Sequence, residues 1–118
     1  MLPAAARMRH RSEFTLAIRE GGRAGRPLLV GHLRIRPETA EQARIGFIVS
    51  RAVGPAVVRN RVRRRLRHLA AGYLQVLPGG SLLVLRANPP AATASQADLA
   101  ADLGLVLRAL LRRQGGAA

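Results

Sequence analysis

The chain has 118 residues, which is the size of one domain, and 48% of them are hydrophobic, which is enough to form a core. It contains no cysteine, which excludes disulfides and thiolate metal sites, and its few aromatic residues exclude an extended base-stacking platform. Its 20 basic residues, all arginine, outnumber its 6 acidic residues and give a net charge of +14, which favours nucleic acid, ahead of an anionic membrane, as the partner.

The first half of the chain predicts one helix and two strands. We expect a helix at 12–20 with Ser12 as its N-cap and with the glycine pair at 21–22 ending it. Residues 28–36 and 44–50 alternate apolar and polar side chains as strands do, and a short polar turn links them. Two strands with so short a link predict an antiparallel hairpin.

The second half predicts two helices around one strand. A helix at 55–76 opens with Pro55, whose missing N–H costs nothing in a first turn, and Pro-Gly-Gly at 78–80 ends it. The strand at 81–87 is almost wholly apolar, so we expect it to be central in its sheet. The last helix, 95–113, has Ser95 as its N-cap. Its apolar stripe consists of Leu99, Leu103, Val106 and Leu110.

These elements, with a further short strand near 52–54, predict an α+β fold. We expect two layers, a small mixed sheet packed by helices, in the order α-β-β-(β)-α-β-α. Residues 1–118 should form a single domain, ordered over about 7–113, with short frayed termini. No apolar run approaches the ~18–20 residues that cross a bilayer, and the first residues lack a stretch typical of a secretion signal. The sequence therefore predicts a cytoplasmic protein with no membrane partner.

The helix at 55–76 carries the most information. At roughly 100° per residue, one of its sides collects the apolar residues Val58, Val62, Leu66, Leu69, Tyr73, Val76 and Leu77. The opposite side collects Asn60, Arg61, Arg63, Arg64, Arg67 and His68, and Arg59 and Arg65 border the apolar stripe. One face should therefore pack on the sheet, and the other should form a cationic rail.

A solvated charged face is the simplest interpretation of isolated arginines, but here the arginines are crowded. Like charges three or four residues apart destabilise a helix, and no acid occurs between residues 42 and 97 to pair them. Guanidinium groups bind phosphate in a bidentate way, and Asn60 can read a base edge or a 2′-hydroxyl. The array therefore indicates nucleic-acid binding.

In this region the chain resembles the protein components of bacterial ribonuclease P. The central motif is Arg59-Asn60-Arg61, followed by Arg64 and Arg67. It is reinforced by the strand at 46–51, Gly-Phe-Ile-Val-Ser-Arg, and supported by Arg11-x-x-Phe14 near the N-terminus. The resemblance covers roughly residues 7–113, and Arg51 replaces the lysine that is usual in the family.

The resemblance implies the order helix–strand–strand–strand–helix–strand–helix, with a left-handed crossover at the arginine helix against the general right-handed rule. It implies that a catalytic RNA removes the 5′ leader of precursor tRNA to give the mature 5′ end. The protein would be the subunit of this endoribonuclease that binds the catalytic RNA and the leader. Mg²⁺ would be held mainly by the RNA subunit and the substrate. The protein would be monomeric, one per RNA, without catalytic or metal-ligating residues of its own.

Carried over to this sequence, the resemblance assigns RNA contacts to Arg51, Arg59, Asn60, Arg61, Arg63, Arg64, Arg67 and His68. It assigns the leader cleft to Phe14, Ile18, His32 and Phe47. The family often has an aromatic residue where Ile18 stands and another near Gly31 or His32. Leader binding here should therefore depend more on shape and charge.

Other interpretations of these residues stay open. Phe14 and Phe47 could each be core residues rather than stacking ones. A structural ribosomal protein or a membrane-active cationic protein would share the basicity. His10, His32 and His68 are too far apart in sequence to indicate a metal cluster, and the acids lie in caps, turns and helix faces rather than in a group that could hold Mg²⁺.

Overall fold

Helices and strands follow one another in the order that the resemblance implied. The computed structural model describes residues 2–116. Its elements are the 3₁₀ turn η1 (Ala4–Ala6), α1 (Arg11–Glu20), β1 (Gly22–Gly25), β2 (Leu29–Ile35), β3 (Arg44–Ile48), the 3₁₀ turn η2 (Arg51–Val53), α2 (Ala56–Ala71), β4 (Ser81–Ala87), the 3₁₀ turn η3 (Pro89–Ala92) and α3 (Gln96–Gly116). The α+β class, with a small mixed sheet packed by helices, is confirmed.

Strand β4 lies in the interior of a four-stranded sheet whose order is β1-β2-β4-β3. It pairs antiparallel with β2 and parallel with β3, and residues 81–85 are all buried, so its predicted central position is confirmed. The predicted hairpin between the strands at 28–36 and 44–50 is wrong. Because β4 is apolar on both faces, it needs a packed layer on each face, and its buried backbone N–H and C=O groups need a partner strand on each side. It therefore inserts between the two strands that follow each other in sequence.

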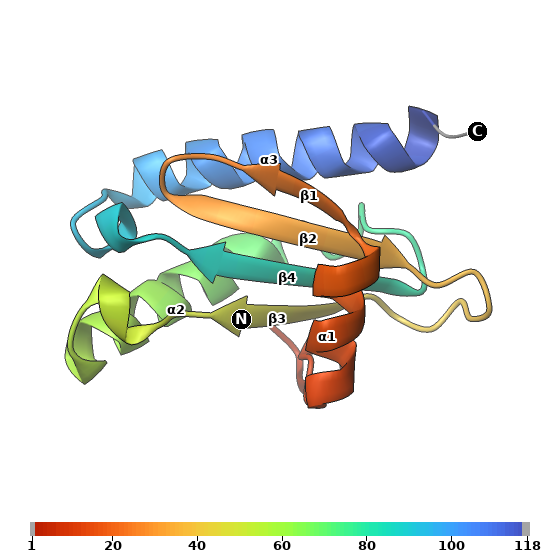
Figure 1. Cartoon of the computed structure of the whole chain (residues 1–118), viewed down its shortest axis with the longest axis horizontal. Helices are drawn as coiled ribbons and strands as arrows, with labels where there is room; N and C mark the ends of the chain where they lie inside the picture. The colour runs from red at the N-terminus through yellow and green to blue at the C-terminus, as the bar shows by residue number, and fades with distance from the viewer. Residues whose placement is uncertain (1, 117–118) are drawn as a thin grey trace.

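The connection from β3 through α2 to β4 is a crossover between parallel strands. In Figure 1 both strands point to the left, β4 lies above β3, and α2 returns behind the sheet. This path turns in the left-handed sense, as the resemblance implied and against the usual preference. The crossover places α2 beside β3, at the edge of the sheet.

Besides the three strands predicted with full patterns, the sheet contains β1, which directly follows α1 and pairs antiparallel with β2. Sequence analysis expected it near 52–54, where the structure has the turn η2 instead, so that expectation is wrong. The sequence of β1, Gly-Arg-Ala-Gly, has no β-branched or aromatic side chain, and Ala24 is its only buried residue. Its strand conformation comes from the free edge of β2 rather than from its own propensity.

Helix α1 covers one face of the sheet, and α2 and α3 cover the other (Figure 1). The sheet therefore lies between helices on both faces, whereas two layers were expected. A Cβ added to Gly46 would lie 2.5 Å from the Phe14 ring of α1, whereas a Cβ added to Gly31 would lie 2.6 Å from Val106 of α3. These two glycines are in register with neighbouring residues of β4, so they face opposite sides of the sheet. The larger core lies on the α3 side and includes the predicted stripe Leu99, Leu103, Val106 and Leu110, all buried.

The predicted N-cap of α1, Ser12, is wrong by two residues. The helix begins at Arg11, with His10 in the N-cap position, and Ser12 lies inside the first turn. The carboxylate of Glu13 accepts a hydrogen bond from the backbone N–H of His10 at 3.3 Å, so the acid does the capping expected of Ser12.

Of the other two helices, one predicted end is confirmed and one is wrong. The start of α3 is confirmed, because the Ser95 hydroxyl accepts a hydrogen bond from the Asp98 N–H at 3.0 Å. Helix α2 ends at Ala71, next to Gly72, rather than at residue 76. Val76 therefore lies outside the helix, and it is 58% exposed instead of joining the apolar stripe.

The first residues pack on the domain, although they were expected to fray. Leu2 and Ala6 are buried around the turn η1. At the other end, α3 reaches Gly116, and residues 117–118 of the expected frayed tail lie outside the described residues. Among the described residues, no helix has both the length and the apolar character that a membrane span requires.

Candidate nucleic-acid interface

The arginines of α2 fall into two groups with different surroundings. The first group donates hydrogen bonds to backbone carbonyls outside the helix: Arg59 Nε to Gly54 O at 3.1 Å, Arg61 to Ala92 O at 3.3 Å and Arg65 to Ala94 O at 3.2 Å. These side chains fasten α2 to the turn before it and to the loop between β4 and α3. Arg61, predicted on the free rail, therefore lies on the fastened side.

The second group lines a hollow of about 380 Å³. Its lining residues are Arg7, Asn60, Arg63, Arg64, Arg67 and His68. Within it, the Asn60 side-chain oxygen accepts a hydrogen bond from Arg63 at 3.0 Å. The structure thus brings most of the predicted RNA-binding residues to one place. Arg51 lies apart from them, exposed in the turn η2.

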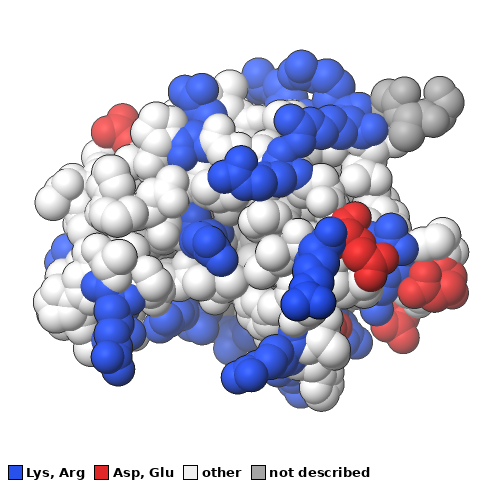
Figure 2. Space-filling model, in the orientation of Figure 1, with Lys and Arg blue, Asp and Glu red and all other residues white. Residues whose placement is uncertain are grey.

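The charge of this hollow is not balanced by acids. Among residues 2–116, the ion pairs all involve arginines outside α2: Arg26 with Asp102 at 3.5 Å, Arg34 with Glu20 at 3.9 Å, and Arg44 with Glu13 at 2.7 Å and Glu41 at 3.6 Å. On the face drawn in Figure 2, acids appear towards the right and at the upper left, and the lower margin is basic. Four of the six carboxylates are therefore paired with arginines away from α2.

Arg67 shows the resulting repulsion. Burial, and then the charges of Arg7 and Arg63, lower its pKa. Because a guanidinium group stays protonated in proteins, the repulsion is not relieved by loss of a proton. A bound anion would relieve it, and a phosphate offers the oxygen acceptors that guanidinium groups prefer.

A second hollow, of about 150 Å³, lies at the outer edge of β3. It is lined by Phe14 and Phe47, together with Gly46 and the arginines that face it from α2. The Phe14 ring occupies the space that a side chain on Gly46 would take. Each of the two phenylalanines also packs against a core cluster, so each has both of the roles that the sequence left open.

The other residues assigned to a leader cleft lie elsewhere. Ile18 packs against the smaller core under α1. His32 is buried in its strand and only 8% exposed. Burial, and then the charges of Arg86 and Arg23, lower the pKa of His32. The structure therefore brings Phe14 and Phe47 together, and it places neither Ile18 nor His32 in their hollow.

Gly31 was the other position at which the family's aromatic residue was considered. Since a Cβ there would lie 2.6 Å from a methyl carbon of Val106, no larger side chain fits beneath α3. Packing of the sheet against α3 therefore excludes an aromatic side chain at Gly31.

Sequence reasoning missed Arg7, which lines both hollows. It precedes the first helix in a run, Arg-Met-Arg-His-Arg, that comes before any acid in the chain. That local density of arginine was the available signal, but nothing in the sequence shows that this run meets α2.

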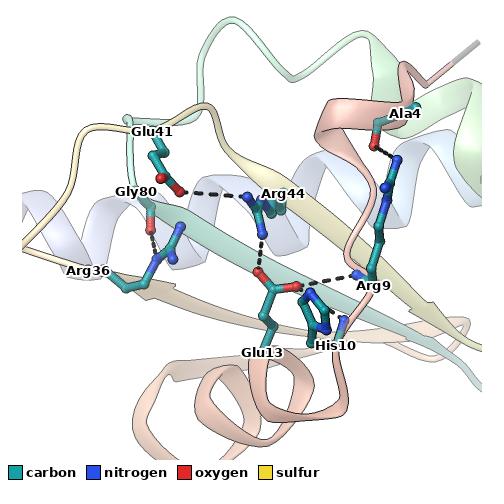
Figure 3. Close-up of polar contacts among 8 residues, drawn as sticks. All are labelled: Ala4, Arg9, His10, Glu13, Arg36, Glu41, Arg44 and Gly80. Atoms are coloured by element: carbon teal, nitrogen blue, oxygen red, sulfur yellow. Dashed lines mark hydrogen bonds and ion pairs between the residues drawn. The ribbon is translucent and has the colours of Figure 1, made fainter.

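Glu13 holds the segment before α1, to which Arg7 belongs, and Figure 3 shows its contacts with Arg9, His10 and Arg44. Its carboxylate accepts hydrogen bonds from Arg44 at 2.7 Å and from the backbone N–H groups of Arg9 at 3.2 Å and His10 at 3.3 Å. Burial acts to raise the pKa of Glu13, but these hydrogen bonds and the Arg44 charge outweigh it and lower the pKa. The ionised acid thereby connects the N-terminal segment, α1 and β3. No three His, Asp or Glu side chains within residues 2–116 form a group that could hold a metal ion.

Comparisons with known proteins match this chain to one family. The family model described as Ribonuclease P matches residues 2–111. A ribonuclease P protein component of Nocardioides sp. is 57% identical over 113 residues, covering 95% of this chain and 94% of that protein. The corresponding protein of Streptomyces bikiniensis is 53% identical, covering 94% of this chain and 96% of its own.

Solved structures share the fold. The ribonuclease P protein of Staphylococcus aureus superimposes with a TM-score of 0.78 at 22% identity, over 88% of this chain and 94% of that one. The protein of Thermotoga maritima gives a TM-score of 0.72 at 24% identity, over 90% of this chain and 96% of that one.

The fold and the site together define a class, that of small α+β proteins that carry an unpaired arginine surface beside the edge of a mixed sheet. Within that class the family match is specific. The chain belongs to the ribonuclease P protein family, the protein components of a tRNA-processing ribonucleoprotein.

Proposed function

We propose that this chain is the RNA-binding subunit of ribonuclease P. Its hollow over α2 binds the catalytic RNA, and the protein assists the Mg²⁺-dependent removal of the 5′ leader from precursor tRNA. The observation that carries the proposal is the group Asn60, Arg63, Arg64, Arg67 and His68 around one hollow. No ion pair joins these arginines to a carboxylate within the described residues. Such an array matches a sugar–phosphate chain, whose charges are closely spaced.

The leader is the proposed ligand of the second hollow. Phe14 and Phe47 offer apolar ring surface there, and Arg63 and Arg67 offer donors for phosphate. A hollow of this size suits stacking or shape recognition of one nucleotide rather than a row of bases. The leader would therefore be held mainly through its backbone, with little dependence on its sequence.

Catalytic Mg²⁺ is the part of the proposal that depends least on this chain. Four of the six carboxylates that could ligate it pair with arginines, as Asp102 does with Arg26 and Glu13 does with Arg44. We assign Mg²⁺ to the phosphates of the RNA subunit and the substrate, where it can stabilise the attacking and leaving oxygens. The protein would favour Mg²⁺ binding indirectly, by holding those phosphates in place.

The test is reconstituted cleavage. The protein is added to its cognate catalytic RNA and a precursor tRNA at low Mg²⁺, and the release of leader is measured. Cleavage should be faster than with the RNA alone. Arg64→Ala should reduce this gain, whereas Arg108→Ala, which removes the same charge from an exposed position of α3, should not. Equal cleavage with and without the wild-type protein would refute the proposal.

A further inference from the structure

The two hollows have three lining residues in common, Arg7, Arg63 and Arg67. Two of these residues belong to α2, and the third comes from the segment before α1. Within residues 2–116, none of the three forms an ion pair with a carboxylate. Where the surface of α2 meets the edge of β3, three positive groups therefore stand together without a counter-charge.

Arg7 sits on an anchored backbone. Its residue forms a parallel bridge with Ile45 of β3, and the next residue, Met8, donates its N–H to the Ile45 carbonyl at 3.0 Å. The Arg7 Nε donates to the Leu2 carbonyl at 3.1 Å, and Leu2 is itself buried. The terminal nitrogens of Arg7 stay available, and the backbone that carries them is already ordered.

The Glu13 contacts fix this segment from its other side (Figure 3). The carboxylate holds the backbone N–H groups of Arg9 and His10 and is itself held by Arg44. Arg7 is thus placed between two anchors, at β3 and at the start of α1. A ligand bound by Arg7 would not have to order a free tail, so little affinity would be lost to conformational entropy.

The chemistry of the three groups selects the ligand. Arginine offers only donors, in a planar fork that matches the oxygens of a phosphate. Arg63 gives one nitrogen to Asn60 and keeps the others free. Arg67 lines both hollows with the other two and lies close enough to each for its charge to act on Arg67. One phosphate at this point would satisfy donors from all three side chains.

We infer that Arg7, Arg63 and Arg67 form one phosphate-binding site, which holds a single backbone phosphodiester of bound RNA where the two hollows join. The inference rests on the proposed function and adds to it a binding residue outside α2. It also gives the bound strand a path from the surface of α2 to the Phe14–Phe47 hollow. The phosphodiester belongs either to the catalytic RNA or to the leader of precursor tRNA.

The test is a double-mutant cycle on RNA affinity. Arg7→Ala and Arg67→Ala should each weaken binding about tenfold, as expected for loss of a charged hydrogen bond. If both residues hold the same phosphate, the double variant should lose far less than the roughly hundredfold product, because residues that share a partner are not additive. The matched control is Arg9→Ala, an exposed arginine of the same segment that lines neither hollow. Combined with Arg67→Ala, it should give the simple product.

Two arms identify the source of the phosphate. If the variants lose affinity for the catalytic RNA in the absence of precursor tRNA, the phosphodiester belongs to that RNA. Loss confined to the holoenzyme's affinity for precursor tRNA, and absent with leaderless tRNA, assigns it to the leader. Arg7→Lys, which keeps the charge and the side-chain stem, provides a second variant that preserves the packing. It should bind more weakly than the wild type, because an ammonium group cannot form the bidentate contact.

The outcomes separate the two proposals. A wild-type protein that binds neither RNA refutes the proposed function and this site with it. A wild type that binds normally, with Arg7→Ala no weaker than Arg9→Ala, refutes the site alone. A double variant that loses the full product of the single effects also refutes the site, because the two arginines would then act on different phosphates.

Discussion

Neighbouring arginines of α2 should have separable roles, and Arg64 and Arg65 provide the test. They are adjacent, they lie on the same helix, and changing either to alanine removes one positive charge. Arg65 donates to the Ala94 carbonyl at 3.2 Å and fastens α2 to the loop before α3. Arg64 is exposed and lines the hollow over α2. We expect Arg65→Ala to lower stability and Arg64→Ala to lower RNA affinity.

The expected change in stability follows from the contact of Arg65. A hydrogen bond from a charged donor contributes about 1.5–3 kcal/mol, and the lower value applies here because the contact is only partly buried. Removing one of several like charges returns roughly 0.3 kcal/mol. Arg65→Ala should therefore lower the free energy of unfolding by about 1 kcal/mol, or about 4 °C in Tm for a domain of this size. Arg64→Ala should stay within about 0.5 kcal/mol of the wild type.

Two assays separate the roles. Urea unfolding followed by far-UV circular dichroism gives the free energies, and RNA binding measured over a range of salt concentrations gives the electrostatic contribution. Arg64→Ala should flatten the plot of log affinity against log salt by about 0.7–0.9, corresponding to one phosphate contact. Arg65→Ala should flatten it by less. If the two variants lose equal stability, or if Arg65→Ala flattens the plot as much as Arg64→Ala, the division of the α2 arginines is wrong.

Three further predictions concern residues around the site. Because the folded state lowers the pKa of Glu13, its ionised form stabilises the protein above about pH 4.3, and this stability is lost as the pH falls through the folded-state pKa. Glu13→Gln should therefore be less stable than the wild type at pH 7. Its free energy of unfolding, measured in urea, should also fall less steeply as the pH is lowered. The lowered pKa of His32 makes protonation unfavourable to folding, so stability should fall as the pH drops below about 6.5, and His32→Leu should remove that dependence in the same assay. Gly46→Ala should lower the free energy of unfolding by about 1–3 kcal/mol, because the Phe14 ring must move. Gly72 is exposed, and a Cβ there would meet only the Leu69 carbonyl oxygen at 3.5 Å, so Gly72→Ala should be neutral or slightly stabilising. Equal thermal shifts for the two variants would contradict the packing.

The elements that the sequence predicted well are those whose pattern is local. The apolar run at 81–87 and the stripe of α3 both appear as expected, because one buried strand and one amphipathic helix each leave a complete signature within their own residues. Strand β1 leaves none although its partner β2 begins only four residues further on, because its two glycines and Ala24 are poor strand formers. The order of strands, by contrast, is non-local. Only the competition of β2 and β3 for the edges of β4 decides that they do not form a hairpin.

The candidate site also has a part that the sequence predicts and a part that it does not. A helical projection places Asn60, Arg63, Arg64 and Arg67 on one side of α2, and the structure brings them to one hollow. The projection gives only the direction of a side chain, however, and not what lies opposite it. The carbonyls that engage Arg61 and Arg65 come from the loop after β4, about 30 residues further along the chain.

Counting arginines on the α2 projection therefore misjudges the number of phosphate contacts in two ways. It includes Arg59 and Arg61, whose donors are partly used by the protein's own backbone. It omits Arg7, which arrives from the N-terminal segment through its pairing with β3. The two errors are opposite in sign, so a total salt dependence that agrees with the sequence-based count would not show which arginines bind RNA. Only the comparison of single variants can show that, because a substitution on the fastened side of α2 lowers stability and one in the hollow does not.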